Sequence, residues 1–127
     1  MVALQEARKA LGGAMDIERI VAKRLMDETG IKAVLEVPRD APGEFLSVEL
    51  TGGNGLGFGS QAFVAVYSWA PTRRRAAEMA GLVELAVPML LHEENVFDAF
   101  PDGTYRLPDP ASGGARYRTN VNLTIFE

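Results

Sequence analysis

The sequence predicts an α+β domain, with a mainly antiparallel sheet of about four to six strands and two helices packed on one face. Residues 44–51 and 115–126 alternate apolar and polar residues at the spacing of strands. Two longer segments, residues 16–30 and 70–90, instead repeat apolar residues at helical spacing. The length of 127 residues fits one domain over residues 1–127.

The first helix is expected to begin after Asp16 and to end at Gly30. Asp16 is a favourable N-cap because its carboxylate accepts hydrogen bonds from the backbone N–H groups of the first turn. Gly30, followed by an apolar residue, is typical of a helix C-terminus, where Gly adopts the left-handed conformation. Residues 1–15, separated by a Gly pair, are expected to be either a mobile arm or a short extra helix.

Three strand-like segments follow the first helix. Residues 33–37 predict a short strand, and residues 44–51 predict a strand with one face on the core. Residues 52–60 are Gly-rich and predict a flexible loop. Residues 61–69 are apolar on both faces, which is typical of a central strand. On such a strand, core packing is the favoured interpretation for Phe63, Tyr67 and Trp69.

The second helix is expected to open at Ala70 to Thr72 and to be kinked or ended by Pro88, which cannot donate a backbone hydrogen bond. After it, residues 95–100 and 104–107 predict two short strands with a turn between them. A long loop is expected before the clearest strand of the chain, residues 115–126. Its apolar residues face one way, and Arg116 and Arg118 belong to its polar face.

Composition excludes several classes of function. The chain has no Cys, which excludes disulfides, thiolate metal sites and Cys nucleophiles. No apolar run approaches the length of about 20 residues that spans a bilayer, and the N-terminus does not resemble a signal peptide. The net charge of −4 argues against a general nucleic-acid coat protein.

A search for chemistry predicts no catalytic, cofactor or metal site. The Gly-rich segment lacks the Lys of a phosphate-binding loop, and a strand follows it where a dinucleotide fold needs a helix. His92 is the only His, and its neighbours Glu93 and Glu94 are too few for a dedicated metal site. We therefore expect a protein that acts through its surfaces and is not an enzyme.

Three segments are the candidate contact surfaces. Arg73, Arg74 and Arg75 place three cations at a helix N-terminus, where the helix dipole disfavours them. They are expected either to pair with local carboxylates such as Glu78 or to meet a neighbouring subunit's acids or DNA. The other candidate contact residues, from the Gly-rich loop and from the last strand with the loop before it, are Gly53, Asn54, Leu56, Phe58, Asp109, Arg116 and Arg118.

The C-terminal third resembles a known family. Residues 103–110 read GTYRLPDP, residues 113–117 read GGARY, and an alternating strand ends the chain. This layout is similar to tail terminator, or tail completion, proteins of long-tailed bacteriophages, most closely those of actinobacterial phages. The resemblance covers residues 16–127.

The resemblance implies a structural virion protein without catalytic residues or cofactors. Such proteins form a ring, expected here to be a hexamer, that caps the tail tube and stops its polymerisation. The implied partners are the chain's own copies, the tail tube protein and the head–tail connector protein, with DNA passing transiently through the lumen. The implied location is the head-proximal end of the tail, and the host cytoplasm during assembly, with no membrane contact.

Two alternatives stay open. The first is a related virion part, namely another head–tail connector or stopper protein or a tail tube subunit. The second is a small-ligand-binding α+β domain or enzyme, in which the aromatic residues of the central strand would line a pocket. Oligomeric mass separates these classes, because only the assembly proteins are expected to form rings or add to tail tubes.

Overall fold

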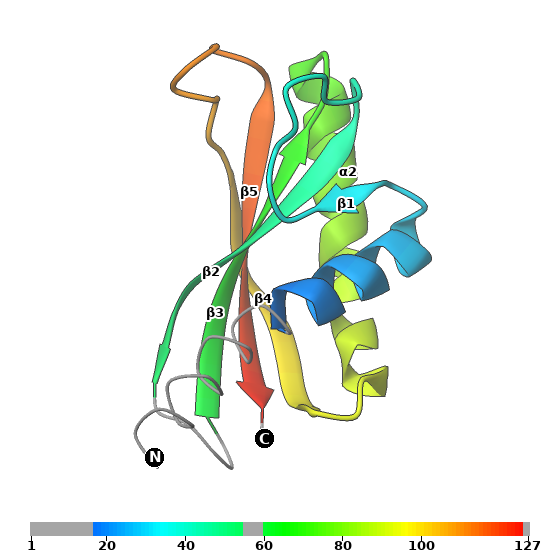
Figure 1. Ribbon diagram of the computed structural model, residues 1–127, viewed down its shortest axis with the longest axis vertical. Helices are drawn as coiled ribbons and strands as arrows, with labels where there is room; N and C mark the ends of the chain where they lie inside the picture. The colour runs from blue at the N-terminus through cyan, green and yellow to red at the C-terminus, as the bar shows by residue number, and fades with distance from the viewer. Residues whose placement is uncertain (1–16, 55–59, 126–127) are drawn as a thin grey trace.

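Alternating apolar residues build a five-stranded sheet with the order β1-β2-β3-β5-β4 (Figure 1). The computed structural model describes residues 17–54 and 60–125. The strands are β1 (Ala33–Val34), β2 (Phe45–Asn54), β3 (Ser60–Trp69), β4 (Val96–Arg106) and β5 (Arg116–Ile125). Only β1 and β2 pair in parallel; the other three pairs are antiparallel. The predicted α+β fold with a mainly antiparallel sheet is confirmed.

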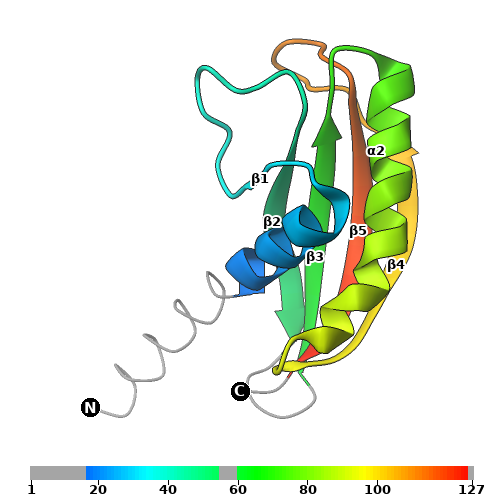
Figure 2. The ribbon, with the colours of Figure 1, turned by 90° about the vertical axis from the view of Figure 1, so that its right-hand side faces the viewer.

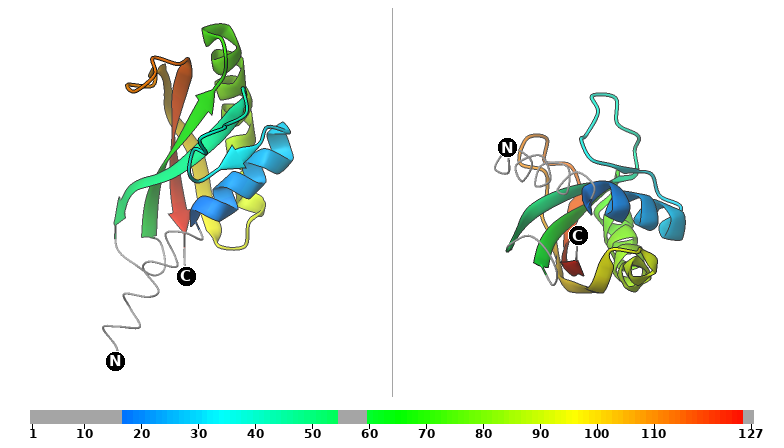
Figure 3. Two further views of the ribbon diagram at one scale, coloured as in Figure 1. Left: turned by 45° about the horizontal axis from the view of Figure 1, so that its top comes forward. Right: turned by 60° about the horizontal axis from the view of Figure 1, so that its bottom comes forward.

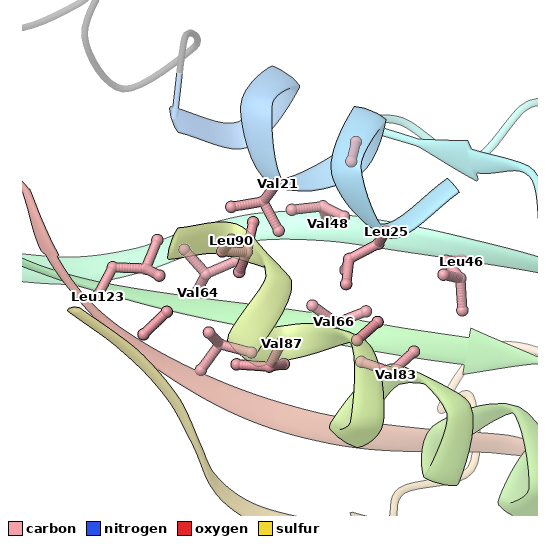
Figure 4. Close-up of a cluster of buried hydrophobic side chains, with 14 of the residues drawn as sticks. Val21, Leu25, Leu46, Val48, Val64, Val66, Val83, Val87, Leu90 and Leu123 are labelled. Atoms are coloured by element: carbon pink, nitrogen blue, oxygen red, sulfur yellow. The ribbon is translucent and has the colours of Figure 1, made fainter. Parts of the chain in front are cut away.

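Both helices pack on the same face of the sheet, as predicted. One helix covers residues 17–29, and the other is α2 (Arg73–Ala86), continued by the 3-10 helix η1 (Val87–His92). Figures 2 and 3 show both on one side of the curved sheet. Val21 and Leu25 of the first helix belong to one apolar cluster with Val83 of α2 and Leu90 of η1. These side chains lie over the apolar residues of the strands (Figure 4). This contact layer is the core.

The first helix ends as predicted. Gly30 has a φ of +75°, a left-handed value that favours Gly, and its N–H donates to the Met26 carbonyl at 2.9 Å. The following Ile31 is buried against the core. The predicted N-cap, Asp16, lies outside the described residues, as do residues 1–15.

β2 is longer than predicted. Gly52, Gly53 and Asn54, expected in a flexible loop, pair with β3 after a bulge that follows Leu50. Gly53 lies so close to β3 that an added Cβ would be 2.5 Å from the Gln61 carbonyl oxygen. Only Gly fits at position 53 without movement of the backbone, so Gly53 serves strand pairing and not loop flexibility.

β4 corrects a second expectation. The predicted turn at residues 101–103 does not separate two strands; one strand runs from Val96 to Arg106. The register shifts between Pro101 and Thr104, and Gly103 takes a φ of +101° within this irregularity. Pro and Gly therefore mark a bulge in an outer strand, where a Pro costs no sheet hydrogen bond.

The second helix changes form at Pro88, as predicted. The α-helical part ends at Ala86, and residues 87–92 continue as the 3-10 helix η1 with Pro88 in its first turn. At the other end, the Thr72 side chain caps α2 by accepting a hydrogen bond from the Arg75 N–H at 3.2 Å.

Ser68 is a polar residue in the core. It is fully buried, and its Oγ is the one buried side-chain oxygen among the described residues that lacks a hydrogen-bond partner. Burying an unpaired hydroxyl destabilises a fold, and its removal is neutral or stabilising. We expect Ser68→Ala to raise the free energy of unfolding by about 1 kcal/mol, measured by urea unfolding. A loss of stability would show that the hydroxyl is satisfied in solution.

Candidate interface on the open face of the sheet

The sheet face opposite the helices carries aromatic and arginine side chains. Strand alternation sends every second residue to this face, and no helix or strand among residues 17–54 and 60–125 covers it (Figure 3). We call it the open face. Its residues are Phe45, Ser47 and Glu49 of β2, Phe63, Ala65, Tyr67 and Trp69 of β3, Phe100 and Tyr105 of β4, and Arg116, Arg118, Asn120 and Asn122 of β5.

The strand register corrects the expected core packing of the aromatic residues. β3 is the central strand, as predicted, but only its even-numbered residues face the helices. Phe63 is 37% exposed, and Tyr67 and Trp69 are half-buried on the open face. A strand can therefore be central in the sheet while helices cover only one of its faces.

Arg116 is held by stacking on two aromatic rings. Its guanidinium carbon lies 4.6 Å from the ring centre of Tyr67 and 4.9 Å from that of Trp69. Its Nε donates to the Leu107 carbonyl at 2.9 Å, which ties β5 to the end of β4. Cation–π contact contributes about 0.5–1 kcal/mol at sites of this exposure. The remaining guanidinium nitrogens can bind an acceptor on a partner.

Trp69 is fixed on its other side as well. Its indole Nε1 donates to the Ser47 Oγ at 2.9 Å, and its ring stacks on Phe45 with 5.2 Å between ring centroids. The indole N–H is therefore satisfied within the domain. The Trp69 ring is a rigid part of the surface.

Arg118 lies two residues after Arg116 on β5 and points to the same face. Its register partners are Tyr67 on β3 and Tyr105 on β4, so a Tyr flanks it on each side. It donates to Asn120 Oδ1 at 2.8 Å and to the Tyr67 hydroxyl at 3.3 Å. Within the described ranges, neither Arg118 nor Arg116 forms a salt bridge. The open face thus presents two cations without a salt bridge to any described residue, although Arg116 lies close enough to Asp109 for its charge to contribute to the lowered pKa of that carboxyl.

A hollow of about 210 Å³ lies beside Arg116 on this face. Tyr67, Trp69 and Glu49 line it from the sheet, and Leu35 and Val37 line it from the segment after β1. Small-molecule sites usually enclose about 300–1,000 Å³. The hollow is therefore the size of one or two side chains, which suits a protein contact better than a ligand.

No protein-family model matches this chain, and no curated protein matches it.

Two kinds of feature are absent from the described residues. In residues 17–54 and 60–125, no group of three or more His, Cys, Asp or Glu side chains could hold a metal ion. His92 is exposed at the end of η1. No helix of this part is long and apolar enough to cross a membrane.

The predicted contact residues fall in separate places. Arg116 and Arg118 lie on the open face. Gly53 and Asn54 lie in β2, while Leu56 and Phe58 are outside the described residues. Sequence reasoning did not select Phe100 and Tyr105, which are 46% and 41% exposed on this face. Strict alternation along β4 would have assigned these two residues to opposite faces of the sheet. The bulge in β4 shifts the register between them and brings both to the open face.

The three arginines at the start of α2 differ in their salt bridges. Arg75 bonds to Glu44 at 3.1 Å and to Glu78 at 3.4 Å, and its pKa is raised, first by the hydrogen bond to Glu44. Arg74 reaches Glu78 at 3.4 Å but is 92% exposed, where such a pair contributes little. Arg73 forms no salt bridge with any described residue. Local pairing therefore accounts for Arg75, whereas Arg73 and Arg74 stay available to a partner.

Asp109 organises the loop between β4 and β5. Its carboxylate accepts from the Ser112 hydroxyl at 2.6 Å and from the backbone N–H groups of Ala111 and Ser112. The Ser112 hydroxyl, followed by those N–H groups and by the charge of Arg116, lowers the Asp109 pKa. Asp109 is therefore bound within its own loop, and its role in any interface is to hold the loop's shape.

This lowered pKa predicts a pH dependence. A carboxyl whose folded pKa lies below its unfolded pKa stabilises the fold above the unfolded pKa. That stabilisation is lost as the pH falls through the folded pKa. We expect Asp109→Asn to lower the melting temperature at neutral pH and to match the wild type at about pH 2, below the ordinary Asp pKa. The same melting difference at both pH values would contradict this role of the charge.

Proposed function

We propose that this chain is a structural subunit of a ring that caps the tail tube of a long-tailed bacteriophage. The open face supports the proposal most strongly. A two-layer domain with helices on one side leaves the other sheet face to solvent or to a partner. Here that face carries Tyr67, Trp69 and Arg116 in a fixed arrangement, and Tyr, Trp and Arg are the residues most enriched at energetic centres of protein interfaces.

The resemblance to tail terminator proteins supplies the proposed partners. The chain would form a ring, proposed to be a hexamer, end polymerisation of the tail tube and present a surface to the head–tail connector. DNA would pass through its lumen during ejection. The proposed location is the head-proximal end of the virion tail, after assembly in the host cytoplasm.

A small-ligand or enzymatic role is the competing proposal, and the hollow beside Arg116 does not favour it. Its volume of about 210 Å³ is below the usual range for such sites, and it lies open on a sheet face. A second virion role, as a connector, stopper or tube subunit, shares the same surface argument and differs only in the partner.

Electron microscopy of tail tubes mixed with the purified chain tests the proposal. We expect a ring at one end of each tube and tubes of fixed length when the chain is present during polymerisation. Added protein distributed along the whole tube would indicate a tube subunit. Tubes that neither bind the chain nor change in length would refute the proposed function.

A further inference from the structure

The outward side of α2 and η1 carries a second apolar surface. Leu82, Leu85 and Met89 follow one another at spacings of three and four residues, which places them on one side of the helix. We call them the outward stripe. Leu85 is 77% exposed, the highest value among the large apolar residues of the described part. The opposite side of α2 is buried on the sheet through Ala76, Met79, Ala80, Val83 and Ala86.

A helix that is apolar on two opposite sides is typical of one that is covered on both. Gly81 adjoins the stripe, is exposed, and would have no atom within 4 Å of an added Cβ. Gly in the middle of a helix costs about 1 kcal/mol relative to Ala. Its absent side chain leaves the helix backbone open to close approach by a partner.

Charge indicates which surface the stripe is complementary to. Residues 82–95 contain Glu84, Glu93 and Glu94 and no Lys or Arg. Arg24 of the first helix pairs with Glu93 at 2.9 Å, and Thr104 donates a hydrogen bond to Glu84. The charges of Glu84 and Glu94 therefore keep this end of the second helix acidic. The centre of the open face presents Arg116 and Arg118, which form no salt bridge within the described ranges. An acidic, apolar helix side and an arginine-rich, aromatic sheet face are complementary.

The dimensions also agree. From Leu82 to Met89 the helix rises about 12 Å, at about 1.5 Å per residue in α2 and about 2 Å per residue in η1. Two strand spacings, from Tyr67 on β3 across β5 to Tyr105 on β4, cover about 10 Å. One helix side therefore matches the width of the aromatic and arginine rows.

We propose that the outward stripe of one copy docks on the open face of the next copy. This proposal rests on the ring function and names the contact that builds the ring. The outward stripe belongs to the helix layer, and the open face is the side of the sheet that faces away from the helices (Figure 2). The contact therefore joins two different surfaces, head to tail. Such contacts propagate from copy to copy and close into a ring where the rotation permits.

Two single substitutions test this contact. Leu85→Glu blocks the stripe, and Tyr105→Glu blocks the open face; both residues are exposed, so the fold is expected to persist. Each variant alone is expected to lose assembly, with the association constant falling more than about tenfold. Mixed in equal amounts, they are expected to form a dimer and nothing larger, because one intact stripe and one intact open face remain. Sedimentation velocity and native mass spectrometry measure the species.

Met26→Glu is the matched control, since it adds the same charge at an exposed apolar position on the first helix. It is expected to assemble like the wild type. Should either blocking variant unfold, Leu82→Gln and Phe100→Glu replace it on the same surfaces.

Each outcome decides between the two proposals. A mixture that forms no dimer, or a blocking variant that assembles like the wild type, overturns this contact. If the wild type still caps tail tubes, the ring function survives that failure. A wild-type chain that stays monomeric and does not bind tail tubes overturns both proposals.

Discussion

Truncation of Leu25 to Ala is expected to lower the free energy of unfolding by about 2–5 kcal/mol. Leu25 is fully buried and joins the first helix to the core, near Leu46 and Val66 of the sheet (Figure 4). The substitution removes buried apolar surface and leaves a cavity that the rigid sheet fills only in part. Urea unfolding followed by circular dichroism measures the change.

The neighbouring residue supplies the control. Met26 is exposed on the same helix, and Met26→Ala is expected to change stability by no more than about 0.5 kcal/mol. Equal effects at the two positions would mean that the first helix does not pack on the sheet through Leu25.

Reversal of charge at Arg118 is expected to weaken assembly strongly while the domain stays folded. Arg118 forms no salt bridge within the described part of the chain, and its hydrogen bonds to Asn120 and Tyr67 are local. Arg118→Glu would place a carboxylate at the centre of the proposed contact. We expect self-association to weaken by about 2 kcal/mol or more, which is over tenfold. Sedimentation equilibrium measures this loss.

Arg19→Glu is the matched control, because Arg19 is exposed on the first helix and undergoes the same change of charge. Its self-association is expected to match that of the wild type. Equal losses for both variants would trace the effect to net charge and not to the open face.

Strand alternation predicted most of this fold because one face of the sheet is buried. In β5, every core-facing residue was assigned correctly, which also placed Arg116 and Arg118 together on the other face. Alternation failed where the strands bulge. Gly52 and Gly53 signal a turn in isolation, and only the close approach to β3 shows that they belong to a strand.

The candidate interface was predictable only in part. The arginines of β5 follow from alternation, but the pattern of β3 is equally apolar on both sides and cannot tell which side the helices cover. Tyr67 and Trp69 were therefore expected in the core and lie on the open face. Helical spacing did separate Leu85 from the buried side of α2, because positions three and four apart from Ala76 select Met79, Ala80, Val83 and Ala86 and leave Leu85 on the opposite side.

The open face is expected to become covered when the protein assembles. Trp69 is the only Trp and lies half-buried on that face, so its fluorescence reports on this surface alone. Acrylamide quenching of Trp69 should be measured as protein concentration rises and the sedimenting mass increases. We predict that the quenching constant falls as the assembly forms. An unchanged quenching constant at full assembly would contradict the claim.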